Sequence, residues 1–71
     1  MNHYVMVIGH YDSTFVGPFV GADAAELWAW AERTTKPQFD FCPMSESDMR
    51  DNLKEFGAVP IYTPAEARGE E

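Results

Sequence analysis

Two apolar runs near the N-terminus constrain the fold of this chain more than any other feature. The first is residues 4–8 (YVMVI), inside a segment of strand character over 3–11, and the second is Thr14–Val20. Both are typical of strands, and residues 10–13 between them have turn chemistry. The first run is apolar on both faces, which is typical of a central strand. Pro18 cannot donate to a sheet ladder, so its end of the second strand must be an edge or a bulge. A hairpin is therefore expected here.

A helix is expected over residues 21–35. Asp23 complements the dipole of its first turn, and Pro37 stops the chain soon after its end. Four apolar residues recur at the i, i+3, i+4, i+7 spacing of one helix face. We predict that they face the core: Ala24, Leu27, Trp28 and Ala31.

The second half of the chain repeats the strand–helix order. Residues 38–42 alternate in polarity, which predicts a third strand that points Phe39 and Phe41 inward and stops at Pro43. A second helix begins near Ser45 or Ser47 as N-cap and ends at Gly57. Its narrow apolar face consists of Met49, Leu53 and Phe56. Residues 59–62 suit a short final strand, and residues 63–66 read as a capping box.

These elements define one α+β domain over residues 1–64, followed by an acidic C-terminal tail over 65–71. The predicted order is β-β-α-β-α, with an optional last strand. We expect a three- or four-stranded, antiparallel-dominated sheet with two helices packed on one face.

Composition narrows the function classes. The single cysteine excludes an intrachain disulfide, and no apolar run reaches the roughly 18 residues of a membrane span. The N-terminus has no signal-peptide pattern, so a cytoplasmic location is expected. Twelve acidic residues against five basic ones give a net charge of −7, which disfavours direct nucleic-acid binding and favours a protein partner with a basic surface. The other reading of this charge is simple solubility.

Few residues suggest chemistry. Cys42 lies in an acidic setting that would not activate a thiol, and a half-buried structural cysteine is the plainer reading. His3, His10 and Asp12 match no metal-site spacing, and the chain has no Gly-rich phosphate loop. We therefore expect no enzyme, no cofactor and no metal. A small thiol-dependent factor that uses Cys42 remains an alternative.

Binding residues are easier to identify. Trp30 points roughly 120° away from the predicted core stripe, at about 100° per residue, as an interface anchor would. Three acidic residues recur at i, i+3 and i+7 on the predicted second helix: Asp48, Asp51 and Glu55. Asp40 could extend this acidic surface. Tyr11 at the hairpin turn could add an aromatic contact. The alternatives are a Trp30 that folds back over the helix shoulder, and acids that form an ordinary solvated helix face.

One local pattern resembles a known group of proteins. Gly17-Pro18-Phe19, followed by a helix with residues 24–29 (AAELWA) and then Glu32-Arg33, is similar to small uncharacterised reading frames of bacteriophages and their hosts. The resemblance covers residues 4–42 and carries no catalytic residues. It implies a phage-type accessory protein that binds and blocks a host factor.

The sequence thus predicts a non-enzymatic, phage-encoded inhibitor that acts through an acidic and aromatic surface. A nucleic-acid-handling defence complex, such as a CRISPR effector, is the expected target, because its basic channels attract acidic decoys. The first alternative is a self-assembly protein that forms a homodimer through an exposed sheet edge. Whether the chain is a monomer or a homodimer is left open.

Overall fold

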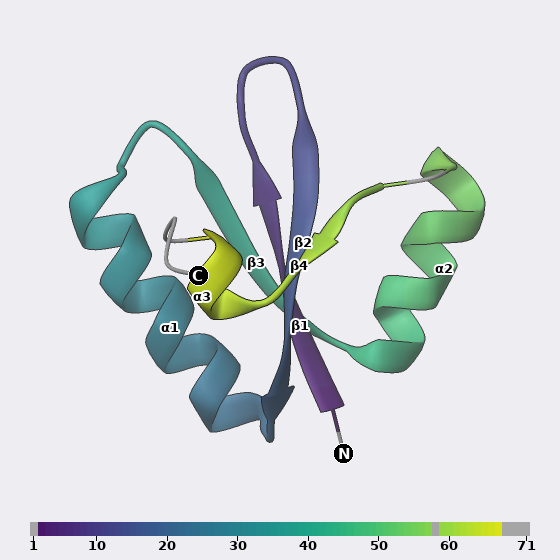
Figure 1. The fold of residues 1–71 in the computed structure, drawn as a ribbon, viewed down its shortest axis with the longest axis horizontal. Helices are drawn as coiled ribbons and strands as arrows, with labels where there is room; N and C mark the ends of the chain where they lie inside the picture. Colours follow the sequence, from purple (N-terminus) through teal and green to yellow (C-terminus); the bar gives the residue numbers. More distant parts are fainter. Residues whose placement is uncertain (1, 58, 68–71) are drawn as a thin grey trace.

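A four-stranded sheet runs between two helices in the computed structural model, which describes residues 2–57 and 59–67 (Figure 1). The elements follow in the order β1 (Asn2–Ile8), β2 (Ser13–Val20), α1 (Ala22–Thr35), β3 (Asp40–Ser45), α2 (Glu46–Phe56), β4 (Ile61–Tyr62) and α3 (Pro64–Ala67). The strand order in the sheet is β3-β1-β2-β4. The α+β class and the β-β-α-β-α order are confirmed. Residues 65–67 of the predicted tail belong to α3, and 68–71 lie outside the described residues.

The central position of β1 follows from its apolar residues on both faces. β1 pairs antiparallel with β2 and with β3, while β2 pairs parallel with β4. Alternate side chains of β1 enter two different hydrophobic clusters. The first cluster contains Val5, Val16, Phe19, Ala25, Trp28, Ala29 and Phe41. The second contains Tyr4, Met6, Phe15 and Met49.

The two main helices therefore cover opposite faces of the sheet, and the prediction that both lie on one face is wrong. α1 belongs to the first cluster, which Ala67 of α3 also joins, and α2 contributes Met49 to the second. Figure 1 shows α1 and α2 on either side of the strands.

Strand order gives the physical reason for this correction. β2, β3 and β4 are all parallel to one another, because β2 and β3 are both antiparallel to β1. The chain crosses the sheet in one direction from β2 through α1 to β3, and returns through α2 to β4. Crossovers between parallel strands strongly favour a right-handed path. Two right-handed crossovers that travel in opposite directions must lie over opposite faces.

The core stripe of α1 is also displaced from its predicted position. Ala25, Trp28 and Ala29 are buried, whereas Ala24, Leu27 and Ala31 face outward. α1 carries two apolar stripes, and its contacts with the sheet decide which one is buried. The ring of Trp28 packs 5.6 Å from that of Phe19 and 6.0 Å from that of Phe41, measured between centroids.

Two prolines behave differently from one another in the sheet. Tyr4 of β1 faces both Gly17 and Pro18, because the register shifts between the pairs His3–Phe19 and Val5–Val16. Of the edge or bulge that the sequence allowed at Pro18, a bulge is observed. Pro43 was expected to stop β3, but the strand continues through it to Ser45. β3 is an edge strand, where a missing N–H on the outer side costs no ladder hydrogen bond.

Candidate protein-binding surface

The outward face of α1 exposes large apolar side chains. We define the outer stripe of α1 as Ala24, Leu27, Trp30 and Ala31. Leu27 is 67% exposed and Trp30 is 64% exposed. At about 100° per residue, both point away from the buried face that holds Trp28. Val20, at the end of β2, is exposed close to the start of the helix. Of the two alternatives that the sequence left open for Trp30, the exposed one is observed, and Leu27 is exposed beside it.

The sequence analysis placed Leu27 in the core, and so missed it as a surface residue. The signal that could have found it is the breadth of the apolar pattern. Apolar residues of α1 occupy two sides of the helix, whereas a helix on a sheet needs to bury only one. One stripe therefore had to remain outside.

Charged groups border the outer stripe. Asp23 lies one turn before Leu27, and Glu26 lies one turn before Trp30, both exposed. The cations of α1 make contacts within the fold. Lys36 Nζ lies 3.4 Å from Glu32 Oε2. Arg33 Nη2 donates to the backbone oxygen of Phe41 at 2.7 Å and ties α1 to β3. The N-terminal part of the stripe is therefore acidic.

A second surface lies on α2. Ser45 caps this helix, since its hydroxyl accepts from the backbone N–H of Asp48 at 3.2 Å. Of the two N-caps that the sequence left open, Ser45 and Ser47, the structure has Ser45. Asp48, Asp51 and Glu55 are all exposed, and their spacing places them on one flank of the helix, which we term the acidic flank of α2.

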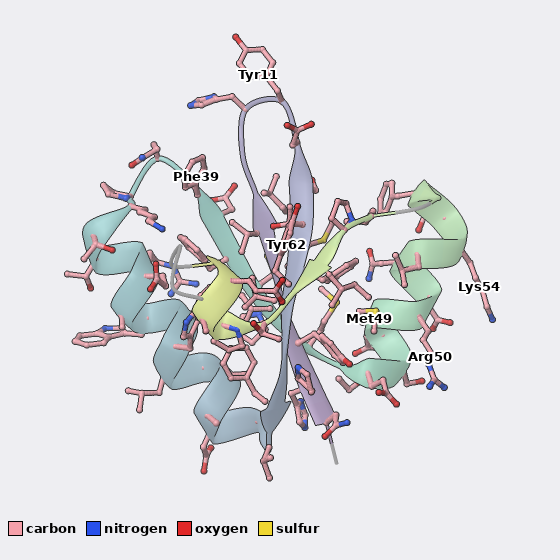
Figure 2. The ribbon with its side chains drawn as sticks, viewed as in Figure 1. Tyr11, Phe39, Met49, Arg50, Lys54 and Tyr62 are labelled. Carbon is pink, nitrogen blue, oxygen red and sulfur yellow. The ribbon has the colours of Figure 1, made fainter. Side chains whose placement is uncertain are left out.

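Two cations of α2 flank the acidic residues and reduce the negative charge of this surface. Arg50 pairs with Glu46 at 3.3 Å between Nη2 and Oε2. Figure 2 shows Arg50 and Lys54 projecting outward from α2, while Met49 points toward the sheet. At about 100° per residue, Arg50 lies on the other side of the helix from Asp48 and Glu55. Lys54, in contrast, is an i,i+3 neighbour of Asp51 and borders the acidic flank.

The structure brings together only part of the predicted binding set. The acidic flank of α2 and Trp30 of α1 lie on opposite sides of the sheet. Tyr11 stands at the tip of the β1–β2 turn and is 98% exposed (Figure 2). Asp40 is exposed at the start of β3, where it pairs with Ile8, next to the hairpin turn. The expected single acidic and aromatic surface is therefore divided among three places.

The residues considered for chemistry are scattered. Cys42 is exposed on β3, opposite Met6 of β1. No group of three or more His, Cys, Asp or Glu side chains within residues 2–57 and 59–67 is arranged to hold a metal ion. None of the described helices is long and apolar enough to cross a membrane.

No protein-family model, curated protein or solved structure matches this chain. Its class is defined by the fold alone, as a small α+β protein with a four-stranded mixed sheet. Function therefore has to be argued from its surfaces.

Proposed function

We propose that this protein is a non-enzymatic binding module that docks onto another protein through the outer stripe of α1. The observation that carries the proposal is the exposure of Leu27 and Trp30 on the helix face that the core leaves unused. Burying a side chain of this size from water contributes about 1.5–3 kcal/mol. Trp is also among the preferred anchors of protein interfaces.

The charge of the domain defines the partner's chemistry. Asp23 and Glu26 border the outer stripe, and the whole chain carries a net charge of −7. A suitable partner has an apolar groove that receives Leu27 and Trp30, with Lys and Arg side chains along its rim. Helix-in-groove docking supplies the affinity, and the opposite charges accelerate encounter.

Inhibition of a nucleic-acid-handling defence complex in the cytoplasm of a phage host is a narrower form of this proposal. The acidic flank of α2 supports it, because three exposed carboxylates on one helix flank suit a basic channel. A flat partner contacts either this flank or the outer stripe of α1, since the sheet separates them. A partner that contacts both must enclose the domain.

The experiment compares three immobilised proteins in a bacterial lysate: the wild type, the double variant Leu27→Ala/Trp30→Ala, and the control Phe56→Ala. Phe56 is 60% exposed on α2, across the sheet from the outer stripe. We expect the wild type and the control to retain a partner that the double variant loses. With the partner purified, each single substitution in the stripe should weaken binding about tenfold or more. Equal capture by all three proteins would refute the assignment of the surface.

The homodimer alternative is less well supported at the sheet edges. Pro43 interrupts the row of donors on β3, and β4 has only the two residues Ile61–Tyr62. Light scattering of the purified chain separates the alternatives. A monomer agrees with a heterologous partner, whereas a stable dimer that Trp30→Ala dissociates would assign the outer stripe to self-assembly.

A further inference from the structure

A cavity of about 250 Å³ lies on the face of the sheet that α1 covers, between α1 and the C-terminal segment. The cavity exists because α1 covers only part of this face, and the short elements β4 and α3 cover the rest. Its walls come from β1, β2, α1, β3, β4, α3 and the loop that carries Phe39.

Four aromatic side chains line this cavity: Trp28, Phe39, Phe41 and Tyr62. The rings of Trp28 and Phe41 stand at 75° to each other with centroids 6.0 Å apart, so that they present differently oriented surfaces. Phe39 is half-buried and Tyr62 is partly exposed; Figure 2 shows Phe39 beside the loop from α1 and Tyr62 on β4. Aromatic faces are negative and attract cations, most strongly where water is excluded.

The charged groups of the lining favour a cation as well. Glu32 and Glu66 contribute two carboxylates, against the single ammonium of Lys36. The Nζ of Lys36 lies 3.4 Å from Glu32 Oε2. The pKa of Glu66 lies below its ordinary value, chiefly because the backbone N–H of Thr63 donates to its carboxylate.

A further observation comes from the indole N–H of Trp28. The side chain is 8% exposed, and its Nε1 atom is buried without a hydrogen-bond partner among the described residues. Buried polar groups without partners are uncommon in folded proteins, and as a donor this N–H can pair only with an acceptor and not with an ammonium group. This one belongs to a side chain that lines the cavity.

We propose that this cavity binds an alkylated ammonium group, held against Trp28, Phe39, Phe41 and Tyr62 and attracted by Glu66. The alkylated ammonium group is either the head of a free small molecule or the end of a methylated lysine side chain. Both present the same positively charged, apolar group. The site is separate from the outer stripe of α1, because it uses the opposite side of that helix.

Nuclear magnetic resonance of the whole chain tests the proposal through its two indole N–H signals. Trp28 lines the cavity, and Trp30 serves as an internal control on the outer face. Four probes are titrated: choline, its uncharged carbon isostere 3,3-dimethylbutan-1-ol, a trimethyllysine peptide and the same peptide unmodified. We expect choline to shift the Trp28 signal saturably, to leave Trp30 in place, and to bind about tenfold more tightly than the isostere.

Preference between choline and the trimethyllysine peptide identifies the source of the group. Equal binding of choline and the isostere would mean a merely apolar cavity and would overturn the proposal. So would a Trp28 signal that none of the charged probes moves.

Single substitutions separate the charge from the aromatic contribution. Tyr62→Leu keeps apolar bulk but removes an aromatic face, and should weaken choline binding several-fold, whereas Phe56→Leu on α2, across the sheet, should not. Glu66→Gln should also weaken it, and Gln can retain the capping-box hydrogen bond. Lys36→Gln removes the competing ammonium and should tighten binding. Tyr62→Leu and Lys36→Gln variants that fold correctly and bind choline as the wild type does would contradict the proposed site.

Discussion

At the scale of single residues, the two tryptophans of α1 have opposite environments. Trp28 is 8% exposed between Phe19 and Phe41, whereas Trp30 is 64% exposed. The buried ring stabilises the fold, and the exposed ring is available to a partner. This difference gives a direct test of the docking face, because stability and binding should respond to different residues.

Trp28→Ala should lower the free energy of unfolding by about 3–5 kcal/mol, since it removes a buried ring and leaves a cavity. A domain this small has little more stability than that, so we expect the variant to be largely unfolded. Trp30→Ala should change stability by less than about 0.5 kcal/mol. Urea denaturation followed by circular dichroism measures both. A large loss on Trp30→Ala would place that side chain in the fold instead of on a docking face.

Gly17 is required by the ring of Tyr4. A Cβ atom added at Gly17 would lie 2.5 Å from Tyr4 Cδ2, and Tyr4 is buried in the second cluster. Gly17→Ala should therefore cost about 1–3 kcal/mol of stability through overpacking. Thermal unfolding of Gly17→Ala beside the exposed control Val20→Ala provides the comparison. Unfolding temperatures that remain equal would show that the bulge relaxes without cost.

At the scale of elements, short-range side-chain chemistry fixes where helices begin and end. Ser45 begins α2, and Gly57 ends it with a φ of 82°, a conformation that favours glycine. Thr63 and Glu66 form the capping box of α3, through hydrogen bonds of 3.1 and 3.2 Å. All of these signals are local, which is why the sequence predicted Gly57 and the capping box correctly and narrowed the cap of α2 to Ser45 or Ser47.

Ser45→Ala should destabilise the protein by about 1 kcal/mol, because the backbone N–H of Asp48 loses its acceptor. Ser47→Ala is the matched control, since Ser47 is exposed in the first turn and does not cap the helix. Chemical denaturation of both variants should show a loss for Ser45→Ala alone. An equal loss for both would mean that the cap is shared between them.

The capping box of α3 should also depend on pH. The folded pKa of Glu66 lies below its ordinary value of 4.5, so the stability it contributes is present above that value and disappears as the pH falls through the lower folded pKa. The amide signal of Thr63, which donates to Glu66, should shift in that acidic range. Glu66→Gln should abolish this transition. A transition that survives the substitution would belong to another group.

At the scale of the whole molecule, the sheet separates two surfaces of different character. One exposes apolar side chains on α1, and the other exposes three carboxylates on α2. With a net charge of −7, the chain should attract a basic partner, and the range of this attraction should shorten as the salt concentration rises.

Binding to the captured partner should therefore weaken strongly between about 50 and 500 mM salt, over which charge screening increases severalfold. The triple variant Asp48→Asn/Asp51→Asn/Glu55→Gln should bind more weakly at low salt and show a smaller salt dependence. Isothermal calorimetry at several salt concentrations measures both effects. An unchanged salt dependence would show that the acidic flank of α2 is an ordinary solvated helix face.

The sequence alone determined the order of strands and helices, the capping box of α3 and the glycine that ends α2, and it limited Pro18 to an edge or a bulge. Each of these depends on residues within a few positions of one another. Only the tertiary structure decided which stripe of α1 is buried, that α2 crosses the opposite face, and that Trp28, Phe39, Phe41 and Tyr62 enclose a cavity. These features depend on the strand order, which joins residues far apart in the chain and which no local pattern encodes.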